Sequence, residues 1–387
     1  MQLYDLGYEL WDEPLDQNID NGQDYYQQPG IPDSLNYFYT LIPVNYSIVQ
    51  TVPHTILGQV ILFDEDAGDE QDPEDDPWIP DPDNCPDPYN PNCPCYEGPC
   101  ARVSNDGKVD LREDLVKKTT RDLLDAGVNL IELYNEAMQL AGYPEEVIDV
   151  GNNGRIQSVR YYPAGYIRVQ DNTLNQNVPV KNVQVKARRL FKIKSEWTND
   201  LGYFSINKGY RQKASIIVKF KNSMVKVRGI NGALKAWQYV FPVRKKIGLF
   251  EKYSLQNINY TFTYSANANS LSALQWSAAH CLNTFADTRN YLQNNGLLGW
   301  APGTEYGIRV WISSVITQNA AAPMLRAIAN SSLVSQTINY LLPTAGEAAK
   351  RVVQNYLPDI TLRLQDGSGN TRIAGDLNGT FFHEFAH

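Results

Sequence analysis

Hydrophobic and polar residues alternate with a period of two between Gly165 and Phe220, the pattern of strands that bury one face. The runs that carry this alternation are Tyr166–Val169, Val178–Ala187, Trp197–Ile206 and Ala214–Phe220. Turn-forming residues separate them, as expected for strands joined by short connections. The pattern predicts a small all-β sandwich over residues 160–225.

Two other segments have the spacing of helices. Residues 109–142 carry an apolar face that Gly127 interrupts, and we expect a helical connector over residues 109–159. A long amphipathic helix is predicted from Leu271 to Leu292, with Leu274, Ala278, Leu282 and Phe285 on its apolar face.

Two strands and a last helix follow this amphipathic helix. Alternation over Gly307–Ile312 and Asp359–Leu364 predicts the strands, and Asp366–Asn370 predicts a turn. Asn378–Thr380 offers a helix N-cap just before Phe381. Residues 260–387 therefore alternate helices with strands, and residues 226–259 are expected to connect them to the sandwich.

The N-terminal part differs in composition. Residues 1–63 are rich in Tyr, Pro and Asp, with short runs such as Tyr37–Ile42 and Thr55–Leu62, and predict a β-rich surface segment. Residues 64–108 form an acidic linker rich in Pro and Cys. This region looks like the N-terminal part of secreted surface proteins of diderm bacteria, which indicates export without naming an activity.

Charge is strongly segregated along the 387 residues, whose net charge is -9. Residues 1–100 hold 21 Asp and Glu and no Lys or Arg, whereas residues 181–250 carry 17 Lys and Arg against Glu196 and Asp200. The acidic part is expected to lie against the basic part, lowering the self-energy of both. The alternative is an external anionic partner, but no nucleic-acid motif accompanies the charge and we expect no nucleic-acid binding.

Four of the five cysteines lie close together in the acidic linker, and the fifth is Cys281. The four are Cys85, Cys93, Cys95 and Cys100. Their spacing does not match the paired C-x-x-C of structural zinc sites, so two disulfides are predicted, with three connectivities open. Disulfides imply an oxidising, exported setting. Cys281 is expected to be a small buried hydrophobe.

Neither a membrane span nor a leader is visible. No run of 18 apolar residues occurs, so no transmembrane helix is predicted. The residues after Met1 lack the basic and apolar regions of a signal peptide, and we expect part of the natural N-terminus to lie outside this sequence.

The last residues form an H-E-x-x-H motif, in which His383 and His387 stand at positions i and i+4. On a helix both imidazoles face the same side and can bind one Zn²⁺. Glu384 then lies beside the open metal position, where its carboxylate can act as general base toward water. His54 and His280 are single histidines, expected at the surface or in packing roles.

The order of helix, strand, helix and strand before this motif resembles the N-terminal half of the zincin catalytic fold, over about residues 260–387. The resemblance implies a zinc metallopeptidase with Glu384 as catalytic residue and His383 and His387 as metal ligands. It also implies that Ile360, Leu362 and Leu364, on the strand nearest the motif helix, contact an extended substrate. Zincins take a third ligand from beyond the motif, so we expect the natural protein to continue past His387 and the chain as given to be a poor enzyme.

The strands of residues 160–225 resemble carboxypeptidase regulatory-like, transthyretin-like modules. The shared features are P-V-x-x-V-x-V at Pro179–Val185 and T-x-D-x-G-Y-F-x-I at Thr198–Ile206. The resemblance implies that Gly202 makes a hairpin turn that directs Phe204 into the core. Such modules act as spacers or binding units beside exported peptidases and outer-membrane proteins.

These patterns together predict a multi-domain α+β protein, with a small all-β sandwich followed by the N-terminal half of a zincin-like domain. We expect a secreted or surface-attached metallopeptidase, associated with the outer membrane, that uses Zn²⁺ on peptide or protein substrates. Attachment to a bacterial surface complex fits the N-terminal resemblance. The alternative is a non-catalytic binding or assembly protein that retains a zincin-like scaffold.

Overall fold

The computed structural model describes residues 121–140, 159–190, 192–222, 224–230, 242–296, 308–314, 319–321 and 358–386. It also describes residues 10–11, 14–15, 30, 37–42 and 54–57. The chain divides into two compact units, Met1–Leu10 with Thr40–Val159, and Trp11–Tyr39 with Arg160–His387. The fold is mixed α+β, and within the described residues the sheets are open rather than closed barrels.

Helix is the main described element of the first unit. Residues 121–125 are helical, and helix α3 spans Leu130–Leu140. Gly127 separates them with a φ of 73°, which confirms the predicted break. Asn129 Oδ1 then accepts hydrogen bonds from the amides of Ile131 and Glu132, the usual capping arrangement for the first turn of a helix.

The second unit contains a sheet built around β1 (Ala164–Asp171). One side of β1 pairs antiparallel with β5 (Tyr203–Ser205) near its start and with β2 (Gln176–Pro179) near its end. The other side pairs parallel with β9 (Ile258–Phe262). We call these four strands the β1 sheet.

A second, fully antiparallel sheet has the order β4-β3-β6-β8. Its strands are β3 (Gln184–Arg189), β4 (Lys192–Trp197), β6 (Ala214–Lys219) and β8 (Arg244–Phe250), and we call it the β3 sheet. The two sheets share one hydrophobic core, to which the β1 sheet contributes Ile167, Val169 and Phe204, and the β3 sheet contributes Val185, Ile216 and Val218.

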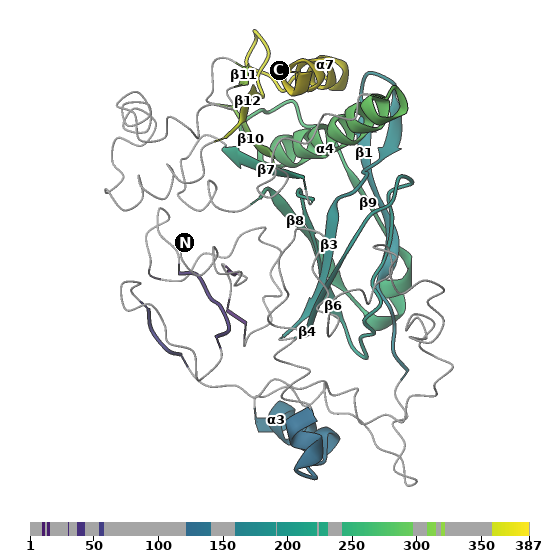
Figure 1. Cartoon of the computed structure of the whole chain (residues 1–387), viewed down its shortest axis with the longest axis vertical. Coiled ribbons are helices and arrows are strands. Elements are labelled where there is room, and N and C mark those ends of the chain that lie inside the picture. Colours follow the sequence, from purple (N-terminus) through teal and green to yellow (C-terminus); the bar gives the residue numbers. More distant parts are fainter. Residues whose placement is uncertain are drawn as a thin grey trace. The chain divides into compact units, whose positions relative to one another are not determined.

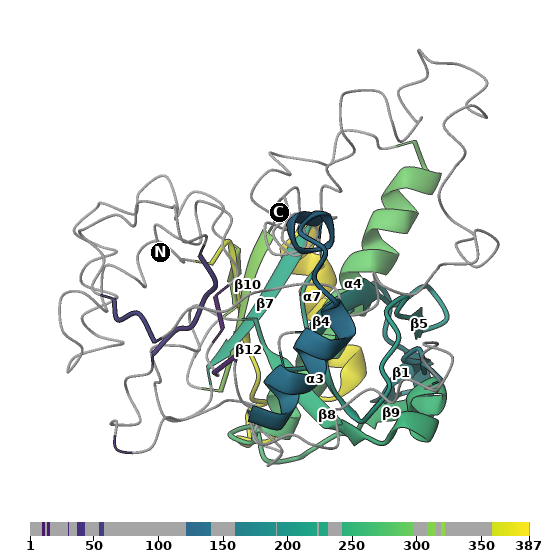
Figure 2. The ribbon, with the colours of Figure 1, turned by 90° about the horizontal axis from the view of Figure 1, so that it is seen from below.

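The third sheet has the order β11-β12-β10-β7, and Figure 2 labels its strands β7, β10 and β12. Strands β7 (Val225–Ile230), β10 (Ile308–Ser313) and β12 (Ile360–Arg363) are parallel, and the two-residue strand β11 (Ala320–Ala321) is antiparallel to β12. We call these strands the β10 sheet. Sequence periodicity predicted β10 and β12 to within one or two residues.

Two helices pack side by side against the β10 sheet (Figure 1). Helix α4 (Leu271–Asn294) contacts β7 and β10, and helix α7 (Ala374–Ala386) contacts β12 and β11. Gly229 of β7 permits the close approach of α4, since a Cβ there would lie 2.3 Å from Leu274 Cδ1. The amphipathic helix predicted over Leu271–Leu292 is thus confirmed, with Cys281 fully buried as expected.

Residues 226–259, predicted to be a connector, contribute structure to all three sheets. They include most of β7, all of β8, a 3₁₀ helix over Lys252–Asn257 and the start of β9. The predicted strand Val178–Ala187 is also divided, because Asn182 has a positive φ of 54° and the chain crosses there from β2 to β3. Which strands share a sheet depends on partners far away in the sequence.

The turn before β5 matches its prediction in part. Gly202 lies in the turn, but β4 and β5 belong to different sheets, so the connection is not a hairpin. Gly202 has a φ of 73°, and a Cβ at this position would lie 2.4 Å from the backbone oxygen of Ile167. Its own carbonyl accepts a 2.8 Å hydrogen bond from the amide of Ile167. Phe204 follows and is buried in the shared core.

Replacement of Gly202 by Ala should therefore destabilise the fold, because both the backbone conformation and the close approach exclude a side chain. We expect a loss of about 1–3 kcal/mol in the free energy of unfolding, measured by urea denaturation. Gly367→Ala is the matched control, since Gly367 has open space around its Cα and should change stability by less than ~0.5 kcal/mol. Equal stability of the two variants would contradict this account of the turn.

Candidate functional site

The first two residues of the H-E-x-x-H motif lie on different faces of helix α7, one buried and one exposed. Ala374, Leu377, Phe381 and Glu384 are buried, and their spacing of three and four residues places them on one side of the helix. His383 is the neighbour of Glu384 in sequence and is exposed. His387 lies outside the described residues, so the structure leaves the pairing of the two histidines as a prediction.

The start of α7 differs from its prediction. The helix begins at Ala374 rather than after Thr380, because its first amides find acceptors that lie outside the local sequence. Asn172 Oδ1 accepts a 2.9 Å hydrogen bond from the amide of Ala374, and Thr173 Oγ1 accepts one of 2.8 Å from Gly375. Both acceptors come from the turn between β1 and β2. The β1 sheet therefore fixes where the motif helix begins.

This turn is itself ordered by Asp171, which is buried at the end of β1. Its Oδ1 accepts 2.9 Å hydrogen bonds from the amides of Thr173 and Leu174. Such bonds within a turn hold the side chains of Asn172 and Thr173 at the tip. A carboxylate inside the fold thus orients the two residues that cap α7.

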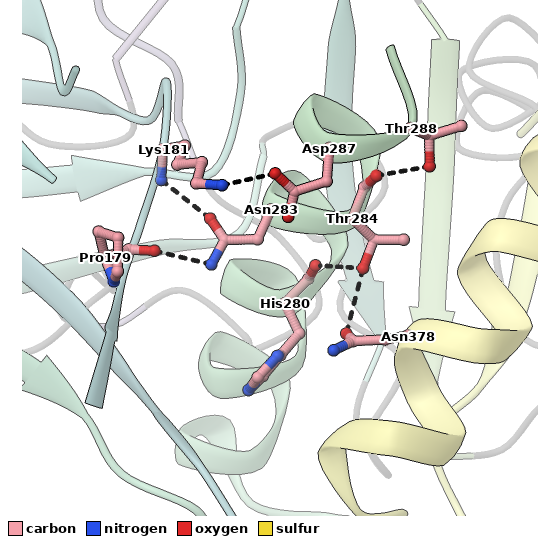
Figure 3. A network of polar contacts seen from close by, with 8 residues as sticks. All are labelled: Pro179, Lys181, His280, Asn283, Thr284, Asp287, Thr288 and Asn378. Atoms are coloured by element: carbon pink, nitrogen blue, oxygen red, sulfur yellow. Dashed lines mark hydrogen bonds and ion pairs between the residues drawn. The ribbon is translucent and has the colours of Figure 1, made fainter. Parts of the chain in front are cut away.

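A polar network joins α4 to its neighbours (Figure 3). Toward α7, Thr284 Oγ1 lies 3.0 Å from the backbone oxygen of His280 and 3.1 Å from Oδ1 of Asn378. Toward the β2–β3 connection, the side-chain amide of Asn283 donates to the Pro179 carbonyl at 2.8 Å and accepts from the Lys181 amide at 2.9 Å. Helix α4 is therefore tied by hydrogen bonds both to the motif helix and to the chain crossing between the first two sheets.

His280 lies at the centre of this region and is only 1% exposed. Its ring packs 4.5 Å from that of Trp276, and Nε2 lies 3.2 Å from the Gln170 carbonyl. Burial lowers the pKa of His280, and hydrogen bonds with Gln170 and Asn378 and the charge of Asp171 only partly oppose this. His280 is therefore a neutral packing residue, one of the two roles expected for it.

The side chain of Glu384 is largely buried, and the residue is 9% exposed. Within the described part of the chain no group forms a hydrogen bond or ion pair with its carboxylate. The carboxylate oxygens are not among the buried polar atoms that lack a partner, so they reach solvent. The carboxylate can therefore accept a hydrogen bond from water or from a bound molecule.

The three residues predicted to contact substrate lie in the core instead. Ile360 is nearly buried and Leu362 and Leu364 are completely buried. Strand β12 pairs with β10 on one side and with β11 on the other, so it lies inside the sheet. Among the described strands, β11 is the outermost one on the side of α7.

The motif fits a zinc site in part. Two imidazoles at positions i and i+4 with an adjacent glutamate are the donor set of a catalytic zinc, which needs a third protein ligand. Within the residues that the structure describes, no group of three or more His, Cys, Asp or Glu side chains gathers. The four cysteines of the acidic linker lie outside those residues, and their disulfides stay a prediction.

Comparison of the chain with family models, with curated proteins and with solved structures gives no match in any of the three. None of the helices in the described part combines the length and apolar composition that a membrane span requires. An interpretation of the site therefore depends on its own geometry.

Sequence patterns did not reveal the residues that position the site. Asp171, Asn172 and Thr173 are typical of a turn, and nothing nearby shows that they cap a helix 202 residues later. Asn378 was assigned to the N-cap, whereas the structure places it inside α7, facing Thr284.

Removing the caps should loosen the first turn of α7. We expect Asn172→Ala and Thr173→Val each to cost about 1 kcal/mol in urea unfolding, because each leaves a helix amide without its acceptor. Hydrogen exchange of the Ala374 and Gly375 amides should become faster in the corresponding variant. Thr173→Ser keeps the hydroxyl and is the control, and a loss as large as in Thr173→Val would contradict the capping role.

Protonation of His280 should destabilise the fold. Because its folded-state pKa lies below the usual 6.5, the unfolded chain binds the proton more readily. The stability that the neutral form of His280 contributes is fully present above about pH 6.5 and is lost as the pH falls toward the folded-state pKa. We expect the free energy of unfolding, measured in urea, to fall more steeply between about pH 7.5 and 5.5 in the natural chain than in His280→Gln. Parallel pH profiles would refute this role.

Proposed function

We propose that this protein is a zinc-dependent metallopeptidase in which Glu384 is the general base. The observation that supports this most is the position of Glu384 next to His383 on α7, with a largely buried side chain whose carboxylate reaches solvent. A carboxylate in contact with water can act on it as a general base. The zincin-like arrangement of residues 260–387 and the regulatory-like sandwich before it belong to the same proposal.

The elements that precede the motif support this arrangement. Helix α4, strand β10, strand β12 and helix α7 occur in this order, and the helix that the resemblance expects between the two strands lies outside the described residues. Both helices pack against the β10 sheet, and the β1–β2 turn holds the start of α7. The helix is thereby a rigid support for side chains that need defined positions.

His383 and His387 would hold the zinc ion together with a third ligand that the described residues do not supply. When bound, zinc would polarise the scissile carbonyl and acidify water. Glu384 would take a proton from water and deliver it to the leaving amine. An extended peptide would add beside β11, the outermost described strand, because β12 is paired on both sides.

Export to the cell surface is part of the proposal, supported by the cysteine content of the linker and by the composition of residues 1–63. Peptide or protein substrates suit such a location. A non-catalytic surface protein with the same scaffold is the competing proposal.

The test uses protein expressed from the complete gene. The natural protein should contain about one zinc per chain and hydrolyse labelled casein or a peptide library. Glu384→Gln should retain zinc but lose about 100- to 10,000-fold in turnover, because general-base assistance is removed. His383→Ala should lose the metal, measured by plasma mass spectrometry.

Asp376→Asn is the matched control, because Asp376 is an exposed acidic residue in the first turn of the same helix. It should keep both zinc and activity. Undiminished turnover in Glu384→Gln would refute the role of Glu384. A natural protein with neither zinc nor hydrolysis would favour the non-catalytic scaffold.

A further inference from the structure

The β3 sheet has a cationic face opposite its apolar face. Directly paired residues of antiparallel strands point to the same side, and Lys186 pairs with Ile217, Lys219 with Arg244, and Ile217 with Lys246. Arg188 follows Lys186 by two residues on β3 and shares that side. Val185, Ala187 and Val218 point the other way, into the shared core.

All five of these cationic residues are buried, from Lys186 at 3% exposed to Lys219 at 9%. Burying positive charge is costly unless electron-rich groups replace water. A segment that covers this face must therefore bring electron-rich groups to it. The described residues include part of this covering segment.

Trp11 lies on this face and is 3% exposed. Its ring is 4.3 Å from Lys186 Nζ, 4.8 Å from Lys219 Nζ and 5.6 Å from Arg188 Cζ. Cations at these distances from an indole are attracted to the electron-rich ring, most strongly when water is excluded. One tryptophan thus contacts three of the five cations.

The main chain after Trp11 is bound as well. Arg188 donates a 2.6 Å hydrogen bond from Nη2 to the Pro14 carbonyl, and Leu15 is buried. Trp11 and Tyr39 exchange backbone hydrogen bonds of 2.8 and 2.6 Å, which hold the segment in an extended pairing. The ring of Trp11 and the carbonyl of Pro14 thus bind separate groups of the β3 sheet, as in recognition of a peptide.

We propose that the cationic face of the β3 sheet is a binding site for a tryptophan-containing acidic peptide, and that Trp11, Pro14 and Leu15 occupy it within the same chain. Charge supports this occupant, because Asp12 and Glu13 follow Trp11 in the sequence and residues 1–100 contain no Lys or Arg. The site goes beyond the proposed peptidase function and does not depend on it. The segment around Trp11 covers this face and shields it from other anions.

Lysine labelling tests the occupancy. In the natural chain, Lys186 and Lys219 should react slowly with an acetylating reagent, and in Trp11→Ala their rates should rise about tenfold, followed by mass spectrometry. Lys181, on the β2–β3 connection, should react alike in both chains. Tyr253→Ala is the matched control, since Tyr253 is an exposed ring that contacts Lys252, and it should leave Lys186 and Lys219 protected.

Peptide binding tests the ligand class. A fluorescent peptide of residues 8–17 should bind Trp11→Ala, measured by anisotropy, and should not bind the natural chain, whose site is occupied. The same peptide with Trp replaced by Ala should not bind, and Arg188→Gln added to Trp11→Ala should weaken binding. If Trp11→Ala fails to fold by circular dichroism, Trp11→Phe replaces it, with rates between those of the natural chain and the free lysines.

Unchanged labelling in the folded variant would overturn the proposal. Peptide binding to neither chain, or to both equally, would do the same. Single-stranded DNA or heparin that binds Trp11→Ala as tightly as the peptide, and to the same lysines, would show a general polyanion site instead. Chains that dimerise through exchanged N-terminal segments would overturn binding within one chain.

Discussion

The first amides of a helix need hydrogen-bond acceptors, and for α7 these are supplied by Asn172 and Thr173 of the β1–β2 turn. Asp171 orders the turn, and the Gln170 carbonyl next to it binds both Trp276 and His280 of α4. The end of β1 is therefore the point at which α4, α7 and the β1 sheet meet. The position of the motif depends on a strand that has no catalytic residue of its own.

This dependence explains which features the sequence could predict. Helix α4 and strands β10 and β12 follow from periodicity, which a short window contains. The Gly202 turn and the buried Phe204 were expected from the resemblance of Thr198–Ile206 to regulatory-like modules. The start of α7 does not, because Gly375 and Asn378 are poor helix formers whose place is set by contacts with residues 173 and 284. The same limit applies to β8 and β9, whose segment was expected to be a connector.

The sequence likewise predicted some features of the candidate site and not others. Motif spacing identified His383, Glu384 and His387, and the helical conformation of residues 383 and 384 is confirmed. Spacing could not show that the side chain of Glu384 is largely buried, or that Ile360, Leu362 and Leu364 are core residues inside the sheet. The docking of the acidic residues on the basic strands stays a prediction, because those acidic residues lie outside the described part of the chain. The contact that the structure does show there is the ring of Trp11 over cations, which net charge does not reveal.

The pairing of β1 with β9 affects how the chain can fold during synthesis. Gly165 pairs with Ile258, so the β1 sheet stays incomplete until the ribosome has released residues about ninety positions later. Strand β6 likewise lacks one of its pairing partners until β8 has been released. Until then both strands have an unpaired edge, a state prone to association with other chains. Residues 160–225 accordingly do not hold all the strands of the β1 and β3 sheets, which are complete only after β8 and β9 have been released.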